Sequence, residues 1–351
     1  IRMINRDEKE MSIQEIVHDM KIGWNLGNSL EAPAPDYLGA LLIDYETSWG
    51  NPKTTKKMIQ EVINAGFNTI RIPVTWGKLM GKGPEYRIVS EWMDRVQEVV
   101  DYAYYEGVYV ILNIHHEDQW LYLGNVDAER NAVEILDKLW KQIARRFQTY
   151  DYHLMFETMN ETRLIGNADE WTAGTAEARR TINRFNETAV RAIRSAGQGN
   201  VDRPIIIKSI GARYNVEAIR DVVVPDNDRR ILLSIHVYEP YQFCMVSGQT
   251  AQWGTREERK ELSKLINDAS AAAQEKGIPI IIGEFGTINK NNEDVRAEYT
   301  AYFVQEAKKR GITCILWDNN IEENEYGYSI FNREKLTWRF PRILRAVIEN
   351  S

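Results

Sequence analysis

The sequence predicts a (β/α)8, or TIM, barrel that forms a single domain over residues 1–351. Three observations support this prediction. Eight short apolar runs of strand length alternate with longer segments whose apolar residues recur at helical spacing. Glycine separates several of these helical segments from the next apolar run. Polar and ionisable residues gather where the apolar runs end, which is the edge where such barrels carry their chemistry.

The predicted strands are continuous apolar runs, as expected of strands that are buried on both faces of a parallel sheet. They span residues 22–26, 67–73, 108–115, 153–161, 204–209, 231–238, 279–285 and 313–317. Eight strands are the number that closes a barrel. An open, doubly wound sheet is the alternative, but no glycine-rich phosphate loop follows the first strand.

The predicted helices are amphipathic segments that lie between these strands. They span residues 54–65, 91–106, 133–147, 177–196, 257–275 and 294–309, and a last helix covers 340–349. Gly66, Gly107, Gly277 and Gly311 each stand between a helical pattern and a strand. Glycine ends helices well because it adopts left-handed backbone conformations at little cost.

Composition limits the classes of partner. The chain of 351 residues is 43% hydrophobic, which is enough for a large core, and its net charge is 44 − 51 = −7. A negative charge argues against nucleic acid, and no apolar run approaches the roughly 20 residues of a membrane-spanning helix. We therefore expect a monomer without nucleic-acid or membrane partners. We expect Cys314 to be a buried small hydrophobe rather than half of a disulfide.

Two glutamates carry the chemical prediction. Glu161 closes the predicted fourth strand, and Glu284 lies at the end of the seventh. Burying a carboxylate is costly unless something uses it. Two carboxyl groups that face one pocket suit glycosidic bond cleavage, in which one gives a proton and the other attacks carbon or activates water. A separation of about 5 Å predicts retention of configuration and one of about 6.5–9.5 Å predicts inversion. The sequence leaves this distance open.

Polar residues at the other strand ends can complete such a site. Arg71 and the hydroxyl of Tyr238 can hold one carboxylate ionised. Asn160 can bond the sugar 2-hydroxyl, a contact that strengthens in the transition state. Asn28, at the end of the first strand, is a candidate for a sugar subsite.

Three of the five histidines also fall at predicted strand ends. His115, His116 and His236 can donate to sugar hydroxyls or orient the acid. Trp317 can form the floor beneath the reacting sugar. Tryptophans in predicted loops are as consistent with packing as with sugar stacking, and Trp49 is the preferred stacking candidate among Trp49, Trp76, Trp120 and Trp253.

Two other readings of these residues stay open. Glu157, inside the predicted fourth strand, could compete as the acid, although we favour a structural ion pair for it. The His-His-Glu triplet at 115–117 could suggest a metal. Adjacent strand residues point to opposite faces, and no His-Glu-x-x-His pattern is present, so we expect no metal.

Seven motifs in this order resemble those of glycoside hydrolase family 5. They are Gly-Trp-Asn-Leu-Gly-Asn at 23–28, Ile-Arg-Ile-Pro at 70–73, His-His-Glu at 115–117, Asn-Glu at 160–161, His-Val-Tyr at 236–238, Gly-Glu-Phe-Gly at 283–286 and Trp-Asp-Asn at 317–319. The resemblance covers nearly the whole chain. It is greatest to the bacterial and rumen-type endo-β-1,4-glucanases, or cellulases.

The resemblance implies a (β/α)8 fold, a retaining mechanism and no metal or organic cofactor. It implies that Glu161 is the acid/base and Glu284 the nucleophile. The remaining matched active-site positions are Arg71, His115, Asn160, His236, Tyr238 and Trp317. The family usually has proline after Asn-Glu, where this chain has Thr162. We expect that departure to affect the loop rather than the chemistry.

We therefore expect a retaining endo-β-1,4-glucanase that hydrolyses internal bonds of cellulose-type glucans. One alternative is an endo-hydrolase of another β-1,4-glycan, namely xyloglucan, mixed-linkage glucan, mannan or xylan. The other is a non-catalytic polysaccharide-binding barrel. Because polymers do not cross membranes, we expect a secreted or cell-surface enzyme whose signal segment precedes Ile1.

Overall fold

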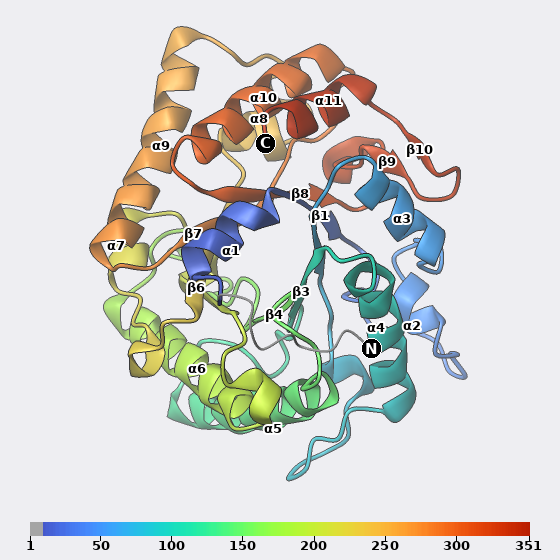
Figure 1. Ribbon diagram of the computed structural model, residues 1–351, viewed down its shortest axis with the longest axis vertical. Helices are drawn as coiled ribbons and strands as arrows, with labels where there is room; N and C mark the ends of the chain where they lie inside the picture. Colours follow the sequence, from blue (N-terminus) through green and yellow to red (C-terminus); the bar gives the residue numbers. More distant parts are fainter. Residues whose placement is uncertain (1–9) are drawn as a thin grey trace.

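The computed structural model describes residues 10–351 as a closed barrel of eight parallel strands, ordered around the barrel as they are in the chain (Figure 1). The strands are β1 (Ile22–Leu26), β2 (Thr69–Ile72), β3 (Tyr109–Asn113), β4 (Leu154–Glu157), β5 (Ile205–Lys208), β6 (Ile231–Val237), β7 (Ile280–Phe285) and β8 (Thr313–Asp318). Strand β1 pairs with both β2 and β8, which closes the barrel. The predicted (β/α)8 fold is confirmed. Residues 1–9, which the predicted domain includes, lie outside the described residues.

Helices surround the barrel and link successive strands (Figure 1). The helices between strands and after the last one are α3 (Lys56–Asn64), α4 (Ser90–Tyr104), α5 (Val126–Arg146), α6 (Ala176–Arg194), α7 (Val216–Arg220), α9 (Arg256–Glu275), α10 (Glu293–Lys308) and α11 (Pro341–Glu349). Helix α5 begins seven residues before the predicted 133, because the side chain of Asn125 caps it by accepting from the N–H of Ala128.

Short elements in loops complete the chain, and the sequence prediction missed them. They are α1 (Ile13–Met20), α2 (Asp44–Thr47), α8 (Tyr241–Met245) and an antiparallel pair formed by β9 (Phe331–Asn332) and β10 (Thr337–Trp338). Helix α1 lies across the centre of the barrel in Figure 1. Its side chains Ile13, Ile16, Val17 and Met20 pack on the interior residues Tyr109, Ile111, Met155, Ile206, Leu232, Ile281 and Ile315. Helix α1 therefore closes the end of the barrel where the strands begin.

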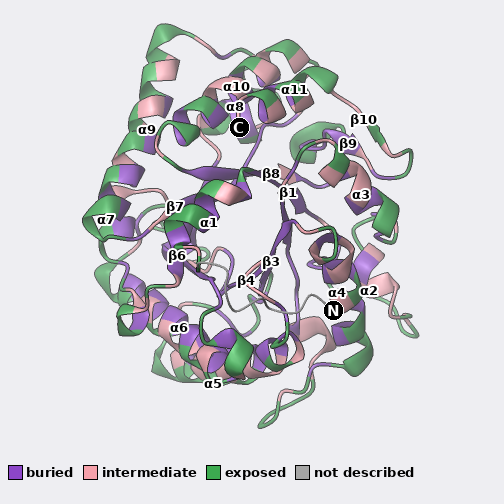
Figure 2. Ribbon diagram, in the orientation of Figure 1, coloured by how far each residue is buried: buried purple, intermediate pink, exposed green. Residues whose placement is uncertain are grey.

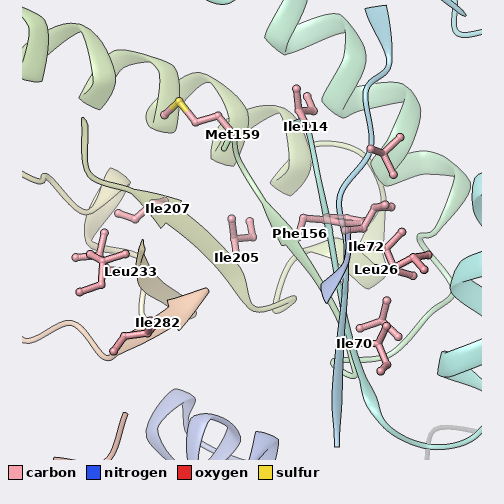
Figure 3. Close-up of a cluster of buried hydrophobic side chains, with 14 of the residues drawn as sticks. Leu26, Ile70, Ile72, Ile114, Phe156, Met159, Ile205, Ile207, Leu233 and Ile282 are labelled. Carbon is pink, nitrogen blue, oxygen red and sulfur yellow. The ribbon is translucent and has the colours of Figure 1, made fainter. Parts of the chain in front are cut away.

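Alternation along the strands separates two hydrophobic cores, and the eight barrel strands are buried apart from the half-buried Trp317 (Figure 2). Side chains that face outward pack against the surrounding helices in one large cluster (Figure 3). Ile70 and Phe156 belong to this outer cluster. Met155, the neighbour of Phe156, instead belongs to the inner cluster beneath α1. The residues above this inner cluster are polar, and they form the site.

Strand β7 contains one extra residue that changes its alternation. Its pairing with β6 passes from Ile235–Ile282 directly to His236–Glu284, and its pairing with β8 is shifted at the same place. Such a bulge re-aims the side chains that follow it. Ile282 and Phe285 therefore both face the outer helices, and Phe285 stacks on Phe303 of α10 with ring centroids 4.5 Å apart. Glu284, between them, faces the barrel interior.

Two further expectations can be compared with the described residues. No helix between residues 10 and 351 has both the length and the apolar character needed to span a bilayer. Cys244 and Cys314 are both buried, and neither is in a disulfide. Cys314 belongs to the outer hydrophobic cluster, which confirms the prediction that it is a buried small hydrophobe.

Candidate active site

Arg71 is the centre of a polar network at the carboxyl ends of the strands. Its side chain is fully buried, and all five of its N–H donors are used. Nε and Nη2 form a bidentate pair with Glu157, at 3.2 and 2.7 Å. The remaining donors reach Asn25, Asn160 and Glu284. Burial alone would lower the pKa of Arg71, but Glu157 and Glu284 outweigh it and raise the pKa, so the guanidinium stays charged.

Glu284 is held as a carboxylate by two donors from different strands. Arg71 Nη1 lies 2.8 Å from Oε2, and the hydroxyl of Tyr238 donates to Oε1 across 2.8 Å. Burial, and then the charge of Glu284, raise the pKa of Tyr238 far above its usual value, so its proton remains available for this bond. The geometry agrees with the sequence-based interpretation that Arg71 and Tyr238 stabilise one ionised carboxylate.

Glu161 lies opposite and is more exposed than Glu284. Its side chain is 22% exposed, against 7% for Glu284. The prediction that Glu161 closes the fourth strand was wrong, because β4 ends at Glu157. The backbone leaves the ladder after Thr158, whose hydroxyl donates to Asn186 of α6, and the following Asn160 turns inward to Arg71. Glu161 therefore comes from a short segment beyond the strand.

His236 connects the two glutamates. Its Nδ1 lies 2.7 Å from Oε2 of Glu161 and 3.6 Å from Oε2 of Glu284. One ligand atom from each of these three residues lies within 4.8 Å of the other two. A carboxylate separation this short belongs to the range used for covalent, retaining chemistry. The triad also has the composition of a metal site. Lys208 Nζ lies 3.0 Å from Nε2 of His236, and this ring nitrogen accepts a hydrogen bond when the lysine is charged.

Aromatic rings line the mouth of the barrel beside the two glutamates. Trp317 stacks on His115, with centroids 6.2 Å apart and planes 8° from parallel. His115 contacts His116 edge-on at 4.5 Å, and His116 in turn contacts Trp49 at 5.7 Å. Asn113 donates to Nδ1 of His115, which leaves the N–H at Nε2. Trp49 is 44% exposed, so its ring is accessible for stacking on a sugar.

The other tryptophans in loops are structural. Trp76, Trp120 and Trp253 are at most 6% exposed. Glu117 is also structural, because its carboxylate accepts from the backbone N–H groups of Trp76 and Gly77 and from the indole of Trp120. The three residues of the His-His-Glu triplet thus differ in their contacts. His115 stacks on Trp317, His116 contacts Trp49, and Glu117 binds backbone N–H groups.

Asn160 and Asn28 have different hydrogen-bond partners in the site. Arg71 Nη2 donates to the side-chain oxygen of Asn160, so the amide NH2 is the group that can meet a ligand. Asn28 has a positive φ of 62°, and its backbone oxygen accepts from Asn51. Between residues 10 and 351, no hydrogen bond or ion pair joins Asn28 to Glu161 or Glu284, and its role in a sugar subsite stays a prediction.

Thr162, which replaces the usual proline, lies in a segment that is held at several points. Its carbonyl accepts from the N–H of Gly211 across 2.8 Å. The next residue, Arg163, donates to the carbonyl of Glu161, pairs with Glu170 and lies 4.0 Å from the ring centroid of Trp171. These contacts restrain the loop without a proline.

Two interior charges complete the site, and the sequence prediction treated only one of them. Glu157 is fully buried and is paired with Arg71, which is the structural ion pair that the sequence favoured. Lys208 closes β5 and lies 3.6 Å from Glu157, yet it was not predicted as a site residue. Its signal was a charge at the end of the apolar run 204–209, the same pattern that identified Glu284.

Comparison with known proteins places this site in a family. The sequence profile described as Cellulase (glycosyl hydrolase family 5) matches residues 35–323. Endoglucanase B of Clostridium cellulovorans is 42% identical over 350 residues, which cover 98% of this chain and 77% of that protein. Endoglucanase A of Ruminococcus albus is 41% identical, with 98% and 94% covered.

Solved structures agree with the sequence comparison. A broad-specificity endoglucanase from Clostridium acetobutylicum has a TM-score of 0.91 and 44% identity, covering 97% of this chain and 100% of its own. A broad-specificity endoglucanase from Ruminococcus champanellensis with bound cellotriose has a TM-score of 0.93 and 38% identity, with 97% and 99% covered. A xyloglucan-specific endo-β-1,4-glucanase from a metagenomic library has a TM-score of 0.91 and 37% identity, also with 97% and 99% covered.

Proposed function

Because this chain belongs to glycosyl hydrolase family 5, we propose that it is a retaining endo-β-1,4-glucanase that cleaves internal bonds of cellulose-type glucans. The observation that carries the proposal is the pair Glu161 and Glu284, with carboxylate oxygens within 4.8 Å of each other on either side of His236. A binding protein has no need of two opposed carboxyl groups held in this way.

In the first step, the carboxylate of Glu284 attacks the anomeric carbon. The bond from that carbon to the leaving oxygen breaks, and protonated Glu161 gives its proton to this oxygen. Arg71 and Tyr238 suit Glu284 to the nucleophile role, because their donors keep it ionised before attack.

In the second step, water enters the place of the departed sugar. Glu161, now ionised, removes a proton from the water as its oxygen attacks the anomeric carbon, and Glu284 leaves as a carboxylate. Two inversions give net retention and return both glutamates to their starting states. The atoms balance with substrate, water and these two residues alone.

The substrate is proposed to be a β-1,4-glucan chain stacked on the aromatic rings at the mouth. Relatives named as endoglucanases, and the neighbour with bound cellotriose, favour cellulose-type chains. The neighbour named as specific for xyloglucan makes that polymer the second candidate. We further propose a single-domain monomer that acts outside the cell or at its surface, since polymeric glucans do not cross membranes.

Glu284→Ala and Glu161→Ala test the two roles. Glu284→Ala should lower kcat by at least about 10⁴-fold on every substrate, because no covalent intermediate forms. Glu161→Ala should lose about 10²–10⁴-fold on cellotetraose, yet still form the glycosyl-enzyme from dinitrophenyl cellobioside, whose leaving group needs no proton. Added azide should then yield the β-glycosyl azide.

Glu257→Ala, in an exposed position of α9, is the matched control and should behave as wild type. Equal losses on both substrates in Glu161→Ala would remove the acid role. NMR of the first product should show the β anomer, and an initial α anomer would mean inversion. Reducing-sugar release from carboxymethylcellulose, mixed-linkage glucan, xyloglucan, mannan and xylan ranks the substrates. Binding without release of reducing ends would indicate a binding protein.

A further inference from the structure

Lys208 lies inside the barrel beneath the catalytic pair and contacts neither glutamate directly. Its side chain is fully buried. Its ammonium lies 3.0 Å from Nε2 of His236, 3.5 Å from Oγ of Ser234 and 3.6 Å from Oε1 of Glu157. Burial lowers the pKa of Lys208 to about 8, with Glu157 opposing this shift, so the group is charged at neutral pH. A buried charge is costly unless a partner compensates it. Glu157 already pairs with Arg71, so it does not serve Lys208 alone.

The chemistry of the two groups determines where the imidazole proton lies. An ammonium has three donors and no lone pair, so the His236 nitrogen that faces it must accept. A neutral imidazole with an accepting Nε2 carries its proton on Nδ1. Nδ1 is the atom that lies 2.7 Å from Oε2 of Glu161. A chain of two directed hydrogen bonds therefore runs from Lys208 through His236 to Glu161.

We propose that Lys208 is a positioning residue for acid–base catalysis, which sets the tautomer of His236 and thereby prevents His236 from accepting the catalytic proton of Glu161. The inference rests on the proposed acid/base role of Glu161. Lys208 is absent from the family motifs that identified the site, and it acts only through His236.

The tautomer of His236 matters because of the alternative state, in which His236 is doubly protonated. If His236 accepted the acidic proton, Glu161 would be ionised and would have nothing to give to the leaving oxygen. The resulting imidazolium would need N–H groups on both nitrogens, and the one on Nε2 would point at the ammonium of Lys208. Burial lowers the pKa of His236 well below its usual value, and Lys208 and Arg71 lower it further against Glu284 and Glu157.

Imidazole NMR of ¹⁵N-histidine-labelled protein tests the tautomer directly. Among five histidines, the His236 signals can be assigned by their loss in His236→Asn. Wild type should show a protonated Nδ1 and an unprotonated Nε2 between pH 5 and 7. A neutral ring with the proton on Nε2, or a doubly protonated ring, would overturn the proposal without any variant of Lys208.

Lys208→Met keeps the length of the side chain and removes its donors. In this variant His236 should lose its fixed tautomer or become doubly protonated. We expect kcat/KM on cellotetraose to fall about 10- to 100-fold, the scale of a weakened general acid. Activity on dinitrophenyl cellobioside should fall less than about threefold, because that leaving group needs no proton.

Lys78→Met is the matched control, since it also removes a lysine ammonium, here half-buried, that donates to protein acceptors. Lys78 Nζ donates to the backbone carbonyls of Leu30, Ala32 and Tyr45, and the lysine contacts no residue of the catalytic pair. Its loss should lower the melting temperature and leave both the tautomer of His236 and the ratio of the two activities unchanged.

The outcomes separate this inference from the proposed function. If Lys208→Met retains the wild-type tautomer and the wild-type ratio of activities, Lys208 has no positioning role. If Glu161→Ala loses both activities equally, the acid assignment fails, whatever the NMR shows. Should Lys208→Met not fold, Lys208→Gln is the second variant, and the wild-type spectrum still decides the tautomer.

Discussion

At the scale of single residues, three glutamates face the barrel interior, and their partners distinguish them. Glu157 accepts from Arg71 and Asn113, lies near Lys208 and is fully buried. Burial would raise its pKa, but Arg71 and Lys208 outweigh this effect and lower the pKa to about 2. A group that is ionised at all working pH values and closed to substrate cannot be the general acid, so Glu161 is the better candidate.

Glu157→Gln should therefore affect stability in a way that depends on pH. The folded pKa, about 2, lies below the usual value of 4.5, so the stabilisation is complete above pH 4.5 and is lost as pH falls toward 2. We expect a loss of about 3–5 kcal/mol at pH 7, which is typical of removing one partner of a buried ion pair. The difference from wild type should shrink below pH 4.5.

Urea unfolding followed at pH 7, 4 and 3 measures this difference. Glu298→Gln is the control, because Glu298 forms an exposed ion pair with Arg259 and should change stability by less than about 0.5 kcal/mol. A difference for Glu157→Gln that stays constant from pH 7 to pH 3 would contradict the assigned role of its charge.

Sequence predicted residue types better than residue positions. Arg71, Tyr238 and Glu284 were found because each is a polar residue at or just beyond the end of an apolar run. Lys208 has the same signal at the end of the predicted fifth strand, but the prediction did not include it. The ring contacts that join Trp49 to His116 bring a long loop to the end of β3. Packing between distant segments creates such a contact, and local sequence carries no record of it.

At the scale of elements, the bulge in β7 determines whether the side chain of Glu284 points into the barrel or toward the outer helices. An unbroken strand would alternate Ile282 outward, Gly283 inward and Glu284 outward. The extra residue brings Glu284 inside and Phe285 onto α10 instead. Gly283 suits this place, because a Cβ there would lie 2.4 Å from Oγ of Ser234.

Gly283→Ala should therefore displace β7 and reduce activity by about 10²-fold, since small misplacements of catalytic groups are costly. Adding Ser234→Ala removes the clashing oxygen and should restore part of the loss. Kinetics on cellotetraose and melting temperatures of both variants measure the effect. Gly286→Ala, whose Cβ would meet Tyr328 at 3.4 Å, is the control and should be far milder. Equal effects of Gly283→Ala and Gly286→Ala would show that the bulge is not the sensitive feature.

Each predicted strand and helix overlaps one in the structure, because apolar runs or helical periodicity extend there over several residues, although β4 ends earlier than predicted. The bulge left no pattern beyond a glycine beside a glutamate. Helix α1 could have been found, because Ser12 and Glu15 form a capping box at its start. The five-residue helices α7 and α8 are too short for periodicity to identify.

At the scale of the whole molecule, the two ends of the barrel have separate tasks. The end where strands begin is closed by α1, whose apolar side chains pack beneath the polar layer. Thr69 and Thr313 donate to the carbonyls of Met20 and Val17, which ties α1 to β2 and β8. The other end carries Glu161, Glu284, Trp317 and the three histidines His115, His116 and His236. Stability and chemistry should therefore respond to different substitutions.

Ile16→Ala tests this division. Ile16 is fully buried under the barrel, and the cavity left by the substitution should cost about 2–5 kcal/mol of stability. Its kcat/KM at 25 °C should stay within about twofold of wild type. Gln14→Ala, on the exposed face of the same helix, should change neither quantity. A large loss of turnover in folded Ile16→Ala would show that the two ends are coupled.

Because α1 closes one end of the barrel, it also restricts the path that a long polymer can take. With that end sealed, no strand of cellulose can thread through the protein and emerge on the far side. Both fragments of a cut chain must depart by the rim at which the intact chain arrived.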